Sequence, residues 1–249
     1  MRLADKVVIV TGAARGLGQR YTVRLAAEGA RVVAADRLDC AATVARIRAA
    51  GGEALAVPVD VADEASTTAL ARAAAERYGR IDVLVNNAAL YGGLEPKPFH
   101  QLSVAEWDQV LAVNVRGTWL CTRAVYPYME RQGGGRIINI ASTIYMTGVP
   151  LLAHYAASKA AVAGLTYALA RELGAANISV VAIAPGLTLT EASTGMIRPR
   201  YIEATAQQTA LRRNVEPDDL EGVVAFLASD ESRFICGAVV TVDGGLAFH

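Results

Sequence analysis

The stretch that decides the fold is Lys6-Val-Val-Ile-Val-Thr-Gly-Ala-Ala-Arg-Gly-Leu-Gly18. Its first half is a short, continuous apolar run, which is typical of a strand buried on both faces of a parallel sheet. Its second half places Gly12, Gly16 and Gly18 directly before a segment with helical periodicity. Glycines at such a turn let the backbone approach a pyrophosphate, and the helix N-terminus adds free N–H groups and a positive dipole end.

The alternation of buried strand, turn and helix continues along the whole chain. The candidate strands are Lys6–Thr11, Arg31–Asp36, Ala54–Val59, Ile81–Asn86, Gly135–Ala141, Ile178–Ala184 and Ala238–Val242. The candidate helices are Arg15–Glu28, Ala41–Ala50, Asp63–Tyr78, Val104–Val115, Gly117–Arg131, Tyr155–Leu173 and Pro217–Ala228. This pattern predicts an α/β protein with right-handed crossovers and a doubly wound, seven-stranded parallel sheet flanked by helices.

No Pro-, Gly- or Ser-rich linker divides the chain, so residues 1–249 are expected to form one domain. The stretch Leu187–Asn214 follows a candidate strand and has no clean period. Such a segment at the carboxyl edge of a sheet is a candidate substrate lid.

Composition restricts the classes of function. Hydrophobic residues make up 53% of the chain, which favours a packed globule over disorder. The formal net charge is zero and no basic block is present, so neither a nucleic acid nor a membrane surface is expected as a partner. The three cysteines lie far apart without metal or redox spacing, and no metal is expected. An odd number of cysteines, and an N-terminal apolar run too short for a signal peptide, favour a cytoplasmic protein.

Asp36 ends the second candidate strand, close to the offset at which an acidic side chain meets an adenosine ribose. Its carboxylate would accept hydrogen bonds from the ribose diol and would repel a 2′-phosphate, which favours NAD over NADP. Arg15 and Arg37 argue in the opposite direction, because either could bind a phosphate.

Tyr155 and Lys159 are four residues apart in a segment with helical character, so both side chains lie on one helix face. A phenol has a reference pKa of about 10, and a nearby ammonium is expected to lower the pKa by favouring the phenolate. The pair could therefore make a proton donor and acceptor near neutral pH.

Taken together, these motifs resemble the compact form of the short-chain dehydrogenase/reductase family, from Lys6 to Gly245. Further matching motifs stand in family order: Asp60, Asn86-Asn-Ala-Ala89, Asn114, Ser142, Pro185-Gly186 with Thr188 and Thr190, and Val242-Asp-Gly-Gly245. Ala89 departs from the family pattern, which has Gly there. The resemblance implies a Rossmann fold and a nicotinamide cofactor.

The resemblance also assigns roles to residues. Tyr155 would exchange a proton with the substrate oxygen, Ser142 would hydrogen bond that oxygen, and Lys159 would hold the nicotinamide ribose. Asn114 would hold a water that connects Lys159 to solvent, or its hydrogen bonds would brace a helix kink. The expected cofactor-binding residues are Gly12, Arg15, Gly16, Leu17, Gly18, Asp36, Arg37, Asp60, Val61, Asn87, Ala88, Tyr155, Lys159, Pro185, Gly186, Thr188 and Thr190.

The expected substrate contacts are Ser142, Ile144, Tyr145, His154 and Leu187. The segments around them are mostly apolar or aromatic and offer no Arg for a carboxylate, which favours a neutral aryl or cyclic secondary alcohol and its ketone. Tyr145 and His154 could instead be packed in the protein. The main alternative is a reductase of 3-oxoacyl chains on a carrier protein, with NADPH; a non-catalytic regulator and an epimerase are weaker alternatives.

Two segments bear on assembly. Gly117–Arg131 is apolar over much of its surface, and Tyr155–Leu173 is rich in Ala and Gly. By resemblance, these helices would pair between subunits, and the C-terminal strand would meet another subunit, in a homotetramer. The small residues could equally serve to pack the helices on the sheet.

Overall fold

A computed structural model describes residues 1–248. Its seven strands form one sheet in the order β3-β2-β1-β4-β5-β6-β7, and every neighbouring pair is parallel. The strands are β1 Val7–Thr11, β2 Arg31–Asp36, β3 Glu53–Pro58, β4 Val83–Asn86, β5 Gly135–Ile140, β6 Ile178–Pro185 and β7 Val239–Val242. The doubly wound α/β fold is therefore confirmed.

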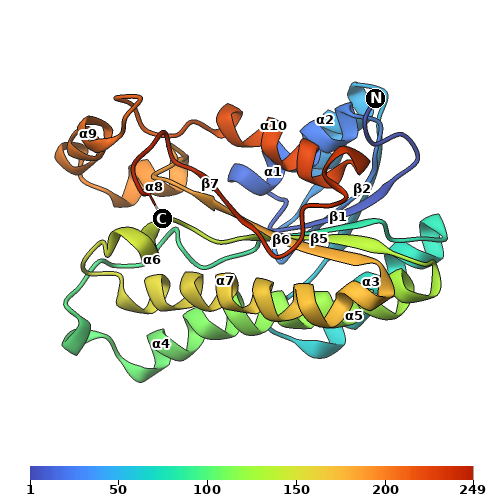
Figure 1. The fold of residues 1–249 in the computed structure, drawn as a ribbon, viewed down its shortest axis with the longest axis horizontal. Coiled ribbons are helices and arrows are strands. Elements are labelled where there is room, and N and C mark those ends of the chain that lie inside the picture. Colours follow the sequence, from blue (N-terminus) through green and yellow to red (C-terminus); the bar gives the residue numbers. More distant parts are fainter. Residues whose placement is uncertain (249) are drawn as a thin grey trace.

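Helices cover both faces of the sheet (Figure 1). On one face lie α1 Gly16–Ala27, α2 Ala41–Ala49 and α10 Pro217–Ala228. On the other lie α3 Glu64–Tyr78, α4 Val104–Leu111, α5 Gly117–Arg131 and α7 Ala153–Leu173. No helix in residues 1–248 is long and apolar enough to cross a bilayer.

The alternating side chains of β1 show why its apolar run is continuous. Val8 and Val10 belong to the core cluster beneath α1, α2 and α10, whereas Ile9 belongs to the cluster beneath α3, α5 and α7. All three side chains are fully buried. Each face of the sheet is therefore covered by a helical layer, so a polar residue on either face of β1 would be desolvated.

The order of the strands reverses between β1 and β4, and the carboxyl ends of these two strands create a crevice there. Val10 is paired with Ala34 on one side and with Val85 on the other. Ligands of open α/β sheets bind outside the carboxyl ends at such a switch point. The Gly-rich turn after β1 lies at this position.

The structure contains several short elements that the sequence did not predict. The stretch Leu187–Asn214 contains two helices, α8 Glu191–Met196 and α9 Pro199–Gln208, and a short helix α6, Ile144–Thr147, precedes α7. The helix expected over Val104–Val115 ends at Leu111 and continues as a π-helical turn, Ala112–Arg116. Two 3-10 turns, Phe99–Gln101 and Gly174–Ala176, flank α4 and α7, and a third is Asp230–Ser232.

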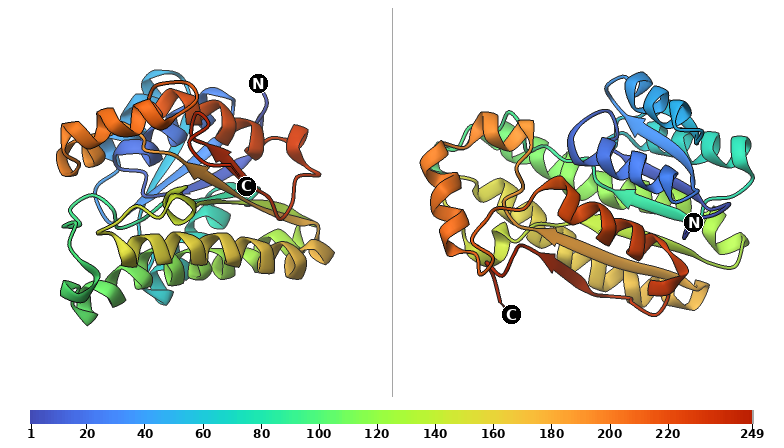
Figure 2. Two further views of the ribbon diagram at one scale, coloured as in Figure 1. Left: turned by 60° about the vertical axis from the view of Figure 1, so that its left-hand side comes forward. Right: turned by 90° about the horizontal axis from the view of Figure 1, so that it is seen from above.

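Figure 2 shows that α8 and α9 stand together at one end of the molecule, at the carboxyl ends of the strands. Both helices begin where local sequence favours a helix start. Thr190 caps α8 by accepting a hydrogen bond from the backbone N–H of Ser193, and Pro199 is the first residue of α9. With six residues, α8 is too short to show a helical period in the sequence, whereas α9 has ten residues and a recognisable start at Pro199.

Candidate active site

The Gly-rich turn is built by two glycines with different tasks. Gly12 has φ +70°, a conformation that a residue with a Cβ adopts only with strain. A Cβ on Gly18 would lie 1.9 Å from the carbonyl oxygen of Gly12, so the first turn of α1 can approach the loop only without one. Arg15, which precedes α1, makes no side-chain cap, and no acidic residue lies in the first turn. The amide groups there suit an anionic pyrophosphate.

The segment after β4 is fastened to this turn. The hydroxyl of Thr11 accepts hydrogen bonds from the backbone N–H groups of Asn87 and Ala88, both at 3.1 Å. The side-chain amide of Asn87 donates to the carbonyl oxygen of Thr11 at 2.9 Å. The two loops at the switch point therefore move as one unit, which gives a ligand a rigid floor.

Asp36 connects the end of β2 to the Gly-rich turn. One carboxylate oxygen accepts from the backbone N–H of Ala14 at 3.0 Å, and the other accepts from the N–H of Leu38 at 2.9 Å. A carboxylate oxygen has more than one lone-pair site, so Asp36 can still accept from a ribose hydroxyl. Arg15 and Arg37 line the same part of the cavity.

Tyr155 and Lys159 lie in the first turns of α7, and both side chains are buried. The Lys159 ammonium donates to the carbonyl oxygen of Ile140 at 2.6 Å and lies 5.6 Å from the centroid of the Tyr155 ring. Ser142 follows β5 and accepts a hydrogen bond from the N–H of Ile144 at 3.3 Å. All three residues line one cavity.

The electrostatics of this group differ from the expectation. Burial raises the pKa of Tyr155 well above its ordinary value; Tyr91 adds to the rise, and an interaction with the Ser142 hydroxyl opposes it. Burial also lowers the pKa of Lys159 to about 8. In this structure burial is the largest cause of both shifts, and Lys159 is not among the causes of the shift at Tyr155.

Asn114 lies in the π-helical turn and is buried, but its side chain does not line the cavity. Its side-chain oxygen Oδ1 accepts from the N–H of Leu90 at 2.7 Å, and its side-chain Nδ2 donates to the Leu90 carbonyl at 3.2 Å and to the Ser158 hydroxyl at 3.0 Å. Asn114 thus holds the loop after β4 against α7. The π turn brings it there, because the extra residue rotates the side chain relative to a regular helix.

One cavity of about 530 Å³ unites most of the expected site. Of the residues expected at the site, it is lined by Gly12, Arg15, Gly16, Leu17, Gly18, Asp36, Arg37, Asp60, Val61, Asn87, Ala88, Ser142, Ile144, Tyr155, Lys159, Pro185, Gly186, Leu187, Thr188 and Thr190. These residues come from the carboxyl ends of six strands, β1 to β6, and from the start of α7, which explains how positions far apart in the sequence meet.

Two expected substrate contacts, Tyr145 and His154, lie outside this cavity. Tyr145 packs against the cluster that contains Val162 and Ala184. His154 is buried, and burial lowers its pKa; Glu106 opposes this lowering and Lys97 adds to it. Adjacent helical residues point about 100° apart, so a neighbour of Tyr155 need not face the same cavity.

Some residues that line the cavity were not predicted from the sequence. Leu38, Val59, Val113 and Leu246 line the cavity although no motif marks them. Ala192, Ile197, Tyr201, Thr205 and Gln208 line it from α8, α9 and the turn between them, within the stretch expected to be a lid. Among residues 1–248, no group of three or more His, Cys, Asp or Glu side chains is placed to hold a metal ion.

Comparison with known proteins places this geometry among nicotinamide-dependent oxidoreductases. A family model described as enoyl-(acyl carrier protein) reductase matches residues 12–247. The cis-4-hydroxycyclohexanecarboxylate dehydrogenase of Sinomonas cyclohexanicum is 40% identical over 97% of this chain and 96% of its own.

Two solved structures share the fold over nearly their whole length. Levodione reductase superposes with a TM-score of 0.93 at 36% identity, covering 98% of each chain. The 3-ketoacyl-(acyl-carrier-protein) reductase of Brucella melitensis, solved in complex with NADH, has a TM-score of 0.89 at 37% identity, covering 99% of this chain and 100% of its own.

Proposed function

Because this chain belongs to the short-chain dehydrogenase/reductase family, we propose that it transfers a hydride between NAD(H) and an apolar secondary alcohol or ketone. The proposal depends on one observation: Ser142, Tyr155 and Lys159 line the same cavity as the Gly-rich turn and Asp36. The lining residues of the segments Leu90–Gly92 and Ile140–Leu152 are glycine or are apolar, aromatic or hydroxylic.

The residues of the cavity fit a dinucleotide. The close approach at Gly18 and the uncapped start of α1 suit a pyrophosphate, and Asp36 suits an unphosphorylated ribose. Asp60 keeps one carboxylate oxygen for a ligand while the other accepts from the N–H of Ala62 at 2.9 Å. Thr188 and Thr190 would bind the carboxamide of the nicotinamide, which supplies or accepts the hydride when it is bound.

Tyr155 carries the proton in this proposal. In reduction, its hydroxyl donates a proton to the oxygen of the former carbonyl; in oxidation, the phenolate takes the proton of the alcohol. The Ser142 hydroxyl stabilises negative charge on the same oxygen. Lys159 and the positive ring of the oxidised cofactor would favour the phenolate and so counteract the effect of burial.

A spectrophotometric screen tests the proposal directly. Purified protein is offered cyclic, aryl and short acyclic ketones with NADH or NADPH, and the corresponding alcohols with NAD or NADP. We expect turnover of neutral ring ketones with a higher kcat/KM for NADH. Turnover of sugars or carrier-bound chains only, with no activity toward any neutral ketone, would contradict the proposal.

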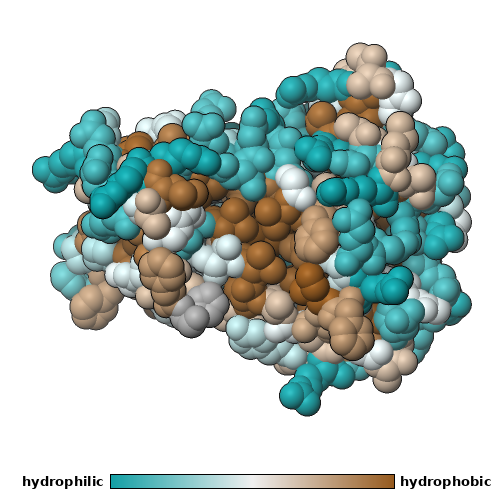
Figure 3. Space-filling view, turned by 45° about the horizontal axis from the view of Figure 1, so that its top comes forward, coloured by the Kyte–Doolittle hydropathy of each residue, from teal (hydrophilic) through white to brown (hydrophobic). Residues whose placement is uncertain are grey.

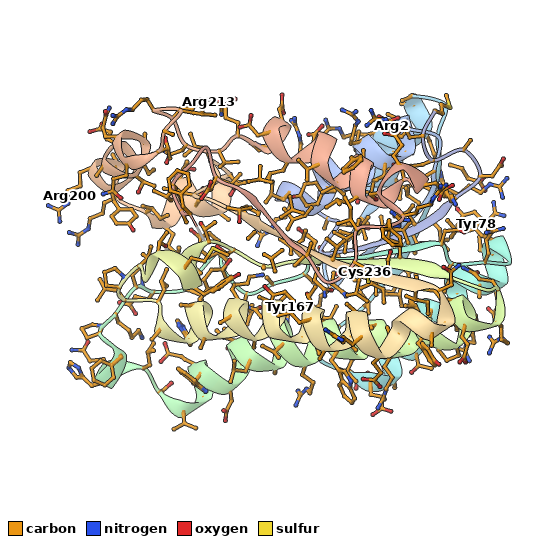
Figure 4. All side chains as sticks on the ribbon, in the orientation of Figure 1. Arg2, Tyr78, Tyr167, Arg200, Arg213 and Cys236 are labelled. Atoms are coloured by element: carbon orange, nitrogen blue, oxygen red, sulfur yellow. The ribbon has the colours of Figure 1, made fainter. Side chains whose placement is uncertain are left out.

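The second candidate is a reductase of 3-oxoacyl groups on a carrier protein, with NADPH. Arg15 and Arg37 on the cavity wall could accept a 2′-phosphate, and Arg200 projects outward from α9, where a phosphate-bearing carrier could meet it (Figure 4). We favour the alcohol dehydrogenase because Asp36 holds the position next to the ribose and its carboxylate would repel that phosphate. The cofactor preference in the screen separates the two candidates.

A further inference from the structure

Tyr91, which has no role in the proton transfer described above, forms the wall beside the proton donor. Its ring centroid lies 5.0 Å from that of Tyr155, with the ring planes tilted by 41°. It packs in one apolar cluster with Ile144, Leu152 and Tyr155. A substrate whose oxygen reaches the Tyr155 hydroxyl therefore carries one of its substituents past the Tyr91 ring.

The position of Tyr91 is fixed by the backbone around it. Leu90, the preceding residue, exchanges two hydrogen bonds with the side chain of Asn114, at 2.7 and 3.2 Å. The carbonyl of Tyr91 accepts from the N–H of Leu94 at 3.1 Å, which closes a turn. The Tyr91 ring is held in turn by packing against Tyr155, so little entropy is lost when a ligand packs on it.

The lid helices close over the same wall. A Cβ on Gly92 would lie 3.0 Å from the Cβ of Ala192, so α8 rests directly on the turn after Tyr91. Met196, the last residue of α8, packs against the cluster that contains Tyr155. In Figure 1, α8 and α9 stand over the end of the molecule at which α6 and the loop after β4 lie.

Tyr201, from α9, supplies a second aromatic ring to the same cavity. Burial raises the pKa of Tyr91 to about 12, and the second cause of the rise is the nearby Tyr201 phenol. One ring is therefore carried by the fixed loop and the other by the lid. Both line the cavity in which the Tyr155 hydroxyl lies.

We propose that Tyr91, with Tyr201 opposite it on the lid, determines specificity by packing against a flat or cyclic substituent on the reacting carbon. This inference rests on the proposed function and names its substrate class: ring ketones and ring-bearing secondary alcohols in preference to acyclic ones. A ring presents a rigid apolar face, whereas a flexible chain must lose rotational freedom to present the same area.

The experiment compares kcat/KM for acetophenone and cyclohexanone with kcat/KM for butanone, at one pH and with saturating cofactor. The ratio is the informative quantity, because every ketone uses the same proton donor and any change in the pKa of Tyr155 cancels. The variants are Tyr91→Ala, Tyr91→Leu, Tyr91→Phe and Tyr201→Ala. Phe99→Ala is the matched control, since Phe99 is an exposed aromatic residue on the same loop and lies outside the cavity.

Loss of an aromatic packing partner is worth up to about 1.5 kcal/mol, so we expect the ratio to fall up to about tenfold in Tyr91→Ala and Tyr91→Leu. A smaller fall is expected in Tyr201→Ala, and none in Tyr91→Phe or the control. An unchanged ratio in all Tyr91 variants would overturn the inference while leaving the proposed function intact. A wild-type protein that reduces no neutral ketone would overturn both. If Tyr91→Ala fails to fold, Tyr91→Leu and Tyr201→Ala decide the outcome.

Discussion

At the scale of single residues, the site places a phenol and an amine where water is excluded. Burial alone makes each of them less prone to ionise, as the raised pKa of Tyr155 and the lowered pKa of Lys159 show. The chemistry then depends on charges that arrive with the ligands. Under the proposed function, Tyr155 would stay protonated until the positive ring of the oxidised cofactor is in place.

Replacing Tyr155 by Phe removes the proton donor and leaves the ring packing intact. We expect kcat to fall about 10²–10⁴-fold, the usual cost of losing a general acid or base. Binding of NADH, followed by fluorescence titration, should stay within a factor of about two of the wild type. Tyr126→Phe is the matched control, because Tyr126 lies on α5 outside the cavity. Near-normal turnover in Tyr155→Phe would remove Tyr155 from the mechanism.

The lowered pKa of Lys159 makes a prediction about stability. Between pH 8 and 10.5 the unfolded chain keeps the proton of this lysine while the folded chain has lost it. The unfolded state then binds more protons, so the free energy of unfolding rises with pH in this window, by up to about 1.4 kcal/mol per unit.

The comparison is between wild type and Lys159→Met, with chemical denaturation at several pH values. The free energy of unfolding of the wild type, relative to that of Lys159→Met, should increase as the pH rises from 8 to 10. Parallel curves for the two proteins would show that Lys159 has an ordinary pKa in the fold.

Some residues of the site could be predicted from the sequence, and others could not. Tyr155, Lys159 and the glycines stand in local patterns whose spacing reports their geometry. Tyr145 and His154 do not line the cavity, and the sequence alone could not separate a substrate contact from a packed side chain at these two positions. Tyr201 and Leu246 reach the cavity only through tertiary packing, which no local pattern records.

At the scale of elements, all seven strands were predicted to within two residues at each end, because strands covered on both faces read as continuous apolar runs. Long helices with a clear apolar face were equally visible. Helices α8 and α9 were missed. The six residues of α8 are too few for a helical period, but α9 has ten residues and Pro199 at its first position, a start signal that the sequence reading did not use. The π turn was missed as well, because the single extra residue leaves the composition of the helix unchanged.

The first βα turn offers a test at this scale. Gly18→Ala places a methyl group 1.9 Å from the Gly12 carbonyl oxygen, so the turn or α1 must shift. We expect loss of measurable NADH binding in a fluorescence titration and a lower Tm. The matched control is Gly222→Ala in α10, where a Cβ meets nothing within 4 Å.

In that control the helix propensity of Ala should stabilise the protein by up to about 1 kcal/mol, with NADH binding unchanged. Normal NADH binding in Gly18→Ala would show that the close approach at this turn is not needed for the cofactor.

At the scale of the whole molecule, two apolar regions are open to solvent. Every residue of β7, the edge strand, is only half-buried, and apolar side chains gather in the middle of the face shown in Figure 3. The second apolar region is a surface hollow between the π turn, α5 and α7, where Trp119 is 40% exposed and lies beside Ala161 and Leu165. We call it the Trp119 hollow. Tyr167 also projects from α7 (Figure 4). These regions coincide with the two faces expected to join subunits of a homotetramer.

A charged substitution in the Trp119 hollow tests one of the two expected interfaces without changing the other. We expect the wild type to sediment as a tetramer and Trp119→Glu to sediment as a dimer, because the change removes the apolar indole and adds a carboxylate that must be desolvated at the interface, while the β7 face is untouched. Leu211→Glu, at another exposed apolar position, should remain tetrameric. Analytical ultracentrifugation reads out the result. A wild-type monomer at micromolar concentration would contradict the expected assembly.

The π-helical turn at Ala112–Arg116 has a consequence for how this gene can change over time. Loss of one codon there would restore a regular α-helix, yet it would swing Asn114 about 100° away from Leu90 and Ser158 and leave its buried hydrogen bonds unmade. Single-residue deletions elsewhere on exposed loops carry no such penalty. The number of residues between Ser103 and Gly117 should therefore stay constant in lineages that keep the activity, even where the identities of those residues drift.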